Sequence, residues 1–255
     1  MTRRMKAMTP DDLRTNMLST YFHLRLGIVI LSALLPWLLV GYGLLVHGEL
    51  KEDSMSAFYG AYNGAMRDYF VGILWAIGSF LILYQGFSVA EDWALNAAGT
   101  CAILLSLNPC YCWTNAPPGS HSLHGAFAIT FFVCMIYVCW FCAYDTVSLL
   151  PDNLESFYEQ AYRWIGWALL SVLVAALMVH LAFPDYHRII FLVEATSVTI
   201  FAGYWATKSA EFRKSAAEER ALRGELEKKR DFGLVEIPKP PPMAIPPQGR
   251  PVLVT

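Results

Sequence analysis

The stretch LRLGIVILSALLPWLLVGYGLLV, residues 24–46, decides the fold class of this chain. Its single charge is Arg25, and the apolar run behind it is unbroken. A bilayer core about 30 Å thick needs roughly 20 apolar residues at about 1.5 Å rise per residue, so this stretch predicts a membrane-spanning helix. Buried strands of a soluble domain are the competing explanation, but they are only about 4–8 residues long.

Five further apolar stretches follow, separated by short polar connections, at 69–87, 94–109, 124–144, 164–183 and 189–207. The composition agrees with a membrane class. The chain is 56% apolar and 16% charged, whereas soluble domains contain about 25% charged residues. We therefore expect an all-α polytopic bundle of six transmembrane helices with a C-terminal cytoplasmic helical extension. No basic patch is interleaved with aromatic residues, so nucleic-acid binding is not predicted.

The distribution of basic residues predicts the orientation. Six spans put both termini on one side of the membrane. If that side is the cytoplasm, all nineteen Lys and Arg residues face it except Lys51, Arg67 and Arg188. Cytoplasmic segments of membrane proteins carry such an excess of positive charge. We expect a multi-pass protein of the cell membrane (an inner membrane), with both termini cytoplasmic and the first helix retained as a signal anchor.

Composition divides the chain into four segments. Residues 1–20 read as a polar cytoplasmic segment, 21–207 as the transmembrane domain, 208–231 as a charged cytoplasmic helix and 232–255 as a disordered Pro-rich tail. Within the charged segment, Glu219 and Arg223 form an i,i+4 pair with the acid first, the favourable order. Proline-rich segments commonly adopt extended conformations that partner proteins bind. A cytoplasmic protein partner is therefore possible, besides the lipid bilayer itself.

Ionisable residues inside a membrane span are expensive, so each one is a functional hypothesis. Glu194 is the clearest case, because it lies five residues into the last apolar stretch. In the expected topology Asp68 and His124 fall in the same outer leaflet. These three residues are therefore candidates for an acid/base or catalytic cluster. Ordinary roles stay open: Asp68 can cap a helix, and Glu194 can hydrogen-bond across a helix contact.

Zinc is the cofactor considered for the same region. A zinc site takes three protein ligands and lowers the pKa of a bound water to about 7. The candidate ligands are His121, His124 and His187, and the i,i+3 spacing of the first two places them on one helical face. No HExxH or comparable metal signature occurs in the chain.

Several sequence blocks resemble a family of uncharacterised bacterial multi-pass membrane proteins. The blocks occur in the family's order and together cover most of 54–208; they are Arg67-Asp68-Tyr69-Phe70-Val71-Gly72, Tyr84-x-Gly86, Asp92-x-x-x-Asn96-x-Ala98-Gly99, His124-x-x-x-Ala128-x-x-Phe131-Phe132, Glu194-Ala195 and Phe201-x-Gly203-x-Trp205-x-x-Lys208. The chain departs from the pattern at Ser88-Val89-Ala90, where an acidic residue and arginines are expected. The resemblance implies a six- or seven-helix bundle and no established activity.

A more distant similarity is to membrane-embedded lipid hydrolases of the alkaline ceramidase and adiponectin-receptor kind. Those enzymes use Ser, Asp and three His around zinc, with two His four residues apart near the C-terminus. In this chain His180 and His187 are seven apart.

Two function classes follow. The leading expectation is a non-catalytic scaffold, sensor or accessory subunit. The alternative is a membrane-embedded hydrolase or small-solute permease with an outer-leaflet His/Asp/Glu site. Whether the protein is an enzyme stays open.

Overall fold

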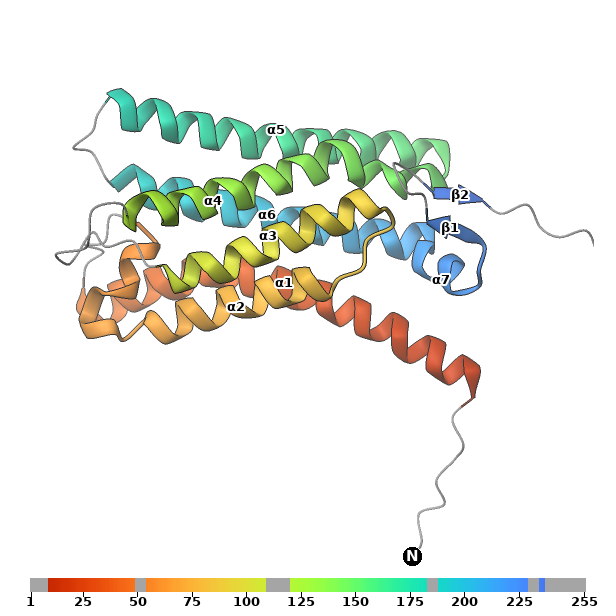
Figure 1. Ribbon diagram of the computed structural model, residues 1–255, viewed down its shortest axis with the longest axis horizontal. Coiled ribbons are helices and arrows are strands. Elements are labelled where there is room, and N and C mark those ends of the chain that lie inside the picture. The colour runs from red at the N-terminus through yellow and green to blue at the C-terminus, as the bar shows by residue number, and fades with distance from the viewer. Residues whose placement is uncertain (1–8, 49–53, 109–119, 183–187, 229–233, 237–255) are drawn as a thin grey trace, which may run out of the picture.

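The computed structural model describes residues 9–48, 54–108, 120–182, 188–228 and 234–236, and this part of the chain is almost entirely helical (Figure 1). Its long helices are α1 (Pro10–His47), α2 (Arg67–Leu83), α3 (Val89–Leu107), α4 (Ser120–Tyr137), α5 (Asp152–Ala182) and α6 (Arg188–Ser215). Short elements complete the described part: the helical turns η1 (Ser56–Tyr59), η2 (Ala61–Gly64), η3 (Val138–Cys142), η4 (Ala143–Asp145) and η5 (Val147–Leu149), the helix α7 (Ala217–Leu222), and the antiparallel strands β1 (Leu226–Lys228) and β2 (Leu234–Glu236).

Within the described residues, four helical segments are long and apolar enough to cross a membrane. They are Pro10–Val46, Leu123–Leu149, Asp152–Val179 and Ile190–Ser215. The helices α2 and α3 fall outside this set, α2 having only 17 residues and α3 carrying Glu91 and Asp92 in its first turn. The expected all-α architecture is therefore confirmed, and four long apolar helices suggest a membrane location. The expected number of six spans is not established by these four helices.

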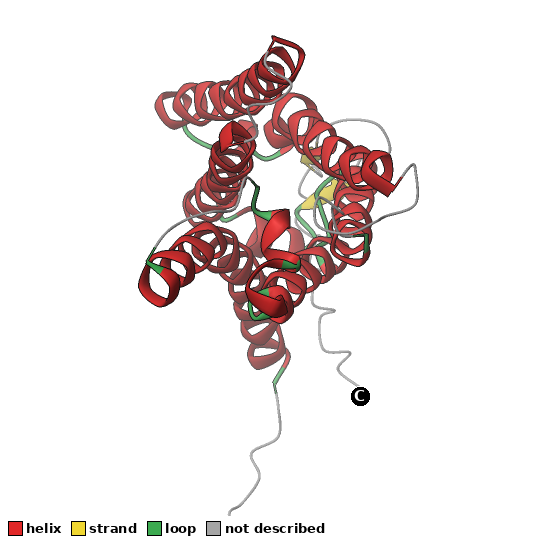
Figure 2. Ribbon diagram, turned by 90° about the vertical axis from the view of Figure 1, so that its left-hand side faces the viewer, coloured by secondary structure: helices red, strands yellow, loops and turns green. Residues whose placement is uncertain are grey.

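The long helices pack in a ring. Each of α1 to α6 contacts the next one along the chain, and α6 closes the ring by packing on α1. Figure 2 looks along the bundle and shows this closed arrangement. We call one end of the bundle the η1 end, because η1 and the first turns of α2, α4 and α6 lie there. The other end, with the 84–88 and 143–151 connections and α7, is the α7 end (Figure 1).

The contact between α2 and α3 depends on two glycines. A Cβ atom on Gly78 would lie 2.6 Å from the carbonyl oxygen of Gly99, and one on Gly99 would lie 2.5 Å from that of Gly78. Both distances are far below van der Waals contact, so only glycine permits this approach. Small residues at helix contacts are a regular device of membrane bundles.

The first helix begins earlier than the apolar pattern predicts. Helix α1 starts at Pro10, not near residue 21, so much of the predicted N-terminal polar segment is helical. Thr9 caps it: its hydroxyl accepts from the backbone N–H of Asp12, whose carboxylate accepts from the Thr9 backbone N–H. This reciprocal capping box satisfies two backbone donors that a helix start leaves unpaired.

The prediction of one continuous charged helix over 208–231 is wrong. Helix α6 ends at Ser215, Ala216 adopts the left-handed conformation at φ +51°, and α7 lasts only six residues before β1. The start of the segment is also not solvated, because Lys208 and Glu211 are fully buried. The expected ion pair between Glu219 and Arg223 does form. Apart from the residues of β2, the Pro-rich tail predicted over 232–255 lies outside the described residues.

Candidate functional site

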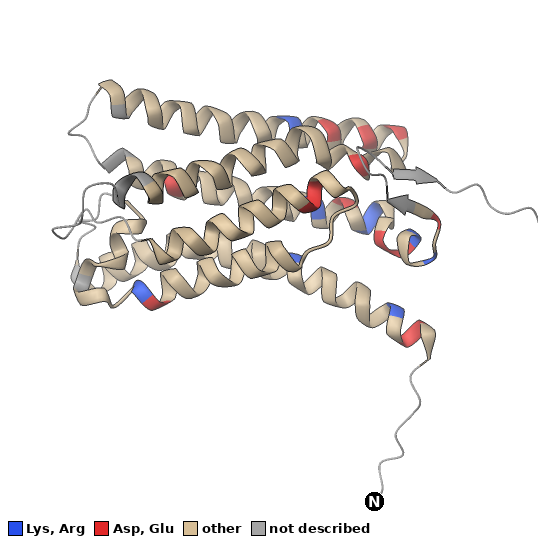
Figure 3. Ribbon diagram, in the orientation of Figure 1, with Lys and Arg blue, Asp and Glu red and all other residues tan. Residues whose placement is uncertain are grey.

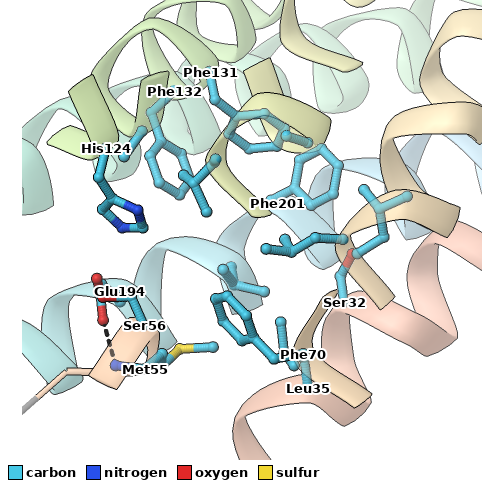
Figure 4. A pocket seen from close by; sticks show the side chains of 16 residues that line it. Ser32, Leu35, Met55, Ser56, Phe70, His124, Phe131, Phe132, Glu194 and Phe201 are labelled. Atoms are coloured by element: carbon cyan, nitrogen blue, oxygen red, sulfur yellow. Dashed lines mark hydrogen bonds between the residues drawn. The ribbon is translucent and has the colours of Figure 1, made fainter. Parts of the chain in front are cut away.

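A cavity lies inside the ring near the η1 end, and side chains from α1, η1, α2, α3, α4 and α6 line it (Figure 4). Its water-accessible volume is about 80 Å³, and it is partly open to the surroundings. The lining is mostly apolar, with Phe70, Phe131, Phe132 and Phe201 among its larger side chains. Among the lining residues, the ionisable ones are His124 and Glu194. The two residues therefore form the polar part of an otherwise apolar chamber.

Glu194 extends from the second turn of α6 toward η1. Its carboxylate accepts a hydrogen bond of 2.5 Å from the backbone N–H of Met55, the residue just before η1 (Figure 4). Because η1 buries the side chains of Ser56, Ala57 and Phe58, this contact anchors a tightly packed turn to α6. An ionised acceptor makes such a bond stronger than a neutral one.

His124 is buried in the first turns of α4, with 7% of its surface exposed. Its Nδ1 atom lies 2.7 Å from the carbonyl oxygen of Asn108, the residue that ends α3. A carbonyl can only accept, so Nδ1 must carry the proton. In the neutral ring Nε2 is then a hydrogen-bond acceptor. The contact joins the end of α3 to the start of α4 and fixes the orientation of the imidazole.

The structure brings together two of the three residues predicted as a catalytic cluster. His124 and Glu194 line the same cavity. Asp68 does not, because its carboxylate is 84% exposed and pairs with Arg67 at 3.2 Å in the first turn of α2. The first turn of a helix favours acidic residues through the helix dipole. The capping role anticipated for Asp68 is not seen, because the N-cap of α2 is Met66 and receives no side-chain hydrogen bond. The predicted three-residue cluster does not form among the described side chains.

The predicted zinc ligands are only partly described. His121 lies on α4, but its side chain is outside the described residues, and so is His187 altogether. No group of three or more His, Cys, Asp or Glu residues that could hold a metal ion occurs in the described part of the chain. The donors that the structure describes at the cavity are one imidazole and one carboxylate. They do not by themselves make up the three ligands that zinc requires.

A second polar cluster lies at the α7 end, and the sequence reasoning missed it. Lys208 on α6 is buried and has three partners: the Glu211 carboxylate at 3.4 Å, the Thr146 hydroxyl at 2.9 Å and the Ala143 carbonyl oxygen at 3.4 Å. Glu211, also buried, accepts a 2.6 Å hydrogen bond from the Tyr162 hydroxyl of α5. Lys208 and Glu211 lie one helical turn apart, on the face that also buries Tyr204 and Phe212. The i,i+3 spacing of Lys208 and Glu211 was the sequence feature from which this ion pair could have been predicted.

An ion pair attaches the C-terminal segment to the first helix. Arg25 of α1 is 1% exposed and donates to the Glu218 carboxylate of α7 through both terminal nitrogens. The ring of Phe212 lies between two cations: the Arg25 guanidinium carbon and Lys208 Nζ are each 4.8 Å from its centroid. Such contacts stabilise desolvated cations. We call Arg25, Lys208, Glu211, Phe212 and Glu218 the clasp.

The connection between α2 and α3 completes this end of the bundle. Asp92 accepts from the backbone N–H of Gly86 at 2.6 Å, and buried Glu91 accepts from that of Phe87 at 2.8 Å. A Cβ atom on Gly86 would come within 2.6 Å of the Glu91 carboxylate. The two carboxylates therefore bind the backbone of the turn between α2 and α3. Gly86, which has no Cβ atom, leaves space for the Glu91 carboxylate.

The fold and these two polar regions define a helical bundle of membrane-protein type. Searches against family models, curated proteins and solved structures find no match to this chain.

Proposed function

We propose that the protein is a six-span protein of the cytoplasmic membrane that acts as a non-catalytic sensor, scaffold or accessory subunit. Both termini lie in the cytoplasm, and the C-terminal segment engages a protein partner. The observation that carries this proposal is the clasp. Through Arg25 and Glu218 it ties the segment that follows the last span to the first helix of the bundle. A change in helix packing is thereby transmitted to the part of the chain best placed to meet a partner.

Ring packing supports six spans. Helices α2 and α3 lie between α1 and α4 in the ring, and α1 and α4 both belong to the segments long enough to span. The 17 residues of α2 correspond to about 26 Å at 1.5 Å per residue, near the lower limit for a span. The acidic residues at the start of α3 lie at the α7 end, where a headgroup region would accommodate them.

Charge supports the orientation. Figure 3 shows acidic and basic residues gathered mainly at the α7 end. Arg67 and Asp68 lie in the first turn of α2, at the η1 end. Of the basic residues, Arg163, Arg213 and Lys214 lie in the half of the bundle that carries α7. An excess of Lys and Arg marks the cytoplasmic side. The α7 end therefore faces the cytoplasm in this proposal, and the η1 end faces outward.

A hydrolase or permease with an outer-leaflet His/Asp/Glu site has less support. It requires Asp68 beside His124 and Glu194, whereas Asp68 lies on the exposed surface of α2.

Two experiments test the proposal. Reporter fusions read topology: fusions at residues 55 and 115 should report an outward location and one after residue 236 a cytoplasmic one. A cytoplasmic signal at 55 or 115 overturns the orientation. Deletion of 237–255 tests the partner, since it leaves every described contact in place. Complementation by this truncated chain should fail while membrane insertion stays normal. Full complementation would indicate that the helical bundle, and not the segment 237–255, carries the function.

A further inference from the structure

We propose that the cavity at the η1 end binds a lipophilic benzoquinol, an aromatic ring with two hydroxyl groups across it and an apolar tail. This inference goes beyond the sensor or accessory role and does not depend on the clasp. It rests on the hydrogen-bonding groups of the cavity, the shape of its walls and its volume.

The polar end of the cavity offers acceptors. His124 commits its Nδ1 proton to the Asn108 carbonyl, so Nε2 has a lone pair to offer. Glu194 contributes a carboxylate: one oxygen already accepts from the Met55 N–H, and in the ionised form both oxygens can only accept. A ligand that reaches these two groups must therefore donate hydrogen bonds. A carboxylate or phosphate group is disfavoured by repulsion from Glu194, and a ketone or ester has no donor to offer.

The walls favour a flat ring. Phe131 packs edge-on against Phe132 at 5.0 Å and against Phe201 at 5.2 Å between ring centroids. Phe70 of α2 lies across the cavity from them (Figure 4). Aromatic rings attract one another in edge-to-face and offset arrangements. A ligand ring would make the same kind of contact with these phenylalanines that they make with one another. An alkyl chain alone gains only the apolar contact.

The opposite end of the cavity supplies a second polar group. Ser32 of α1 is fully buried, and its hydroxyl has no hydrogen-bond partner among the described residues. Figure 4 places it away from His124 and Glu194, with the apolar side chains between. A buried hydroxyl without a partner is costly and calls for an explanation. An oxygen on the far side of a ligand ring would satisfy it.

Volume agrees with such a head group. The water-accessible volume of about 80 Å³ is well above the roughly 10–15 Å³ that a cavity needs to hold a single water, so the cavity has room for a group larger than water. A benzoquinol head has eight ring carbons and oxygens together. Because the cavity is partly open to its surroundings, an alkyl tail can extend toward the lipid.

Binding to the purified full-length protein in detergent tests the proposal. Decyl-benzoquinol, kept reduced under anaerobic conditions, should bind saturably and raise the thermal unfolding temperature. Its oxidised form, decyl-benzoquinone, lacks hydroxyl donors and should bind at least tenfold more weakly, since a hydrogen bond to a charged acceptor contributes roughly 1.5–3 kcal/mol and 1.4 kcal/mol is tenfold. Decylamine serves as the competing donor. Equal or tighter binding of the quinone or the amine overturns the proposal.

Variants locate the site. His124→Phe removes an acceptor and fills space, so it should abolish quinol binding, whereas His23→Phe, the same change on an exposed part of α1, should leave the affinity unchanged. Ser32→Ala removes only one hydroxyl and should weaken binding about threefold to tenfold. If the His124→Phe variant does not fold, the Ser32→Ala variant still tests whether the ligand occupies this cavity. Unchanged affinity in Ser32→Ala and His124→Phe, or equal loss in the His23 control, contradicts the assignment.

Discussion

The two ends of the bundle handle buried polar groups in opposite ways. At the α7 end, Arg25 of α1 pairs with Glu218 of α7 and Lys208 of α6 pairs with Glu211, and both cations lie over the Phe212 ring. At the η1 end, His124 and Glu194 each bind a backbone group and face a cavity. Ion pairs between elements tie those elements together, whereas polar groups that line a cavity can contact a ligand. This comparison predicts that substitutions at the α7 end mainly affect stability and those at the η1 end mainly affect binding.

The largest effect is expected at Lys208. Replacement by Met leaves the Glu211 carboxylate buried without its cation, and breaking a buried ion pair in this way costs about 3–5 kcal/mol. Denaturant-induced unfolding in detergent measures this loss. Lys214→Met is the matched control, because Lys214 is exposed and its described contact is with the Tyr158 ring; its cost should stay under about 1 kcal/mol. Comparable losses in both variants would contradict the role of the clasp.

Arg25→Gln should have the next largest effect. It removes a bidentate, largely buried ion pair with Glu218, and hydrogen bonds between charged groups contribute about 1.5–3 kcal/mol. The segment from α7 onward should also become more sensitive to added protease. Arg223→Gln, which breaks an exposed pair with Glu219, controls for charge loss and should cost under about 1 kcal/mol. Unchanged proteolysis in Arg25→Gln would show that the clasp does not hold α7.

At the η1 end, two substitutions of Glu194 should differ in their effects on stability and on binding. Glu194→Leu removes the acceptor for the Met55 N–H and should cost about 1–3 kcal/mol, the usual penalty of an unpaired buried donor. Glu194→Gln keeps a side-chain carbonyl that can accept, so its stability should stay within about 1 kcal/mol of the wild type. The Gln variant should nevertheless weaken binding in the cavity. A Gln variant that matches the wild type in binding and in complementation would remove Glu194 from any functional site.

The smallest effect is expected at Asp68. Its exposed pair with Arg67 contributes about 0–1 kcal/mol, and the residue does not line the cavity. Asp68→Asn should leave both thermal stability and ligand affinity within experimental error. A binding defect in this variant would support the cluster of Asp68, His124 and Glu194 that the sequence predicted.

The long helices were predictable because span length and apolarity are local properties. The i,i+4 ion pair between Glu219 and Arg223 was predictable for the same reason. The break at Ala216 was not, since nothing in the local pattern of alanines and charges disfavours a helix there. The turn at Ala216 brings Glu218 to Arg25, a residue 193 positions away in sequence.

The candidate site divides in the same way. Glu194 could be identified from sequence alone, because a carboxylate inside an apolar helix is conspicuous wherever the helix packs. His124 was identified in the same way, but the other residues that line the cavity with Glu194 were not. The direction a residue faces depends on the rotation of its helix within the ring, and that rotation is set by packing among all the helices. Asp68 therefore faces outward although its depth suggested otherwise, and Ser32, unremarkable in sequence, lies on the cavity wall. Composition and periodicity determined that this is a membrane-type helical bundle, whereas only the tertiary packing decided which polar groups meet.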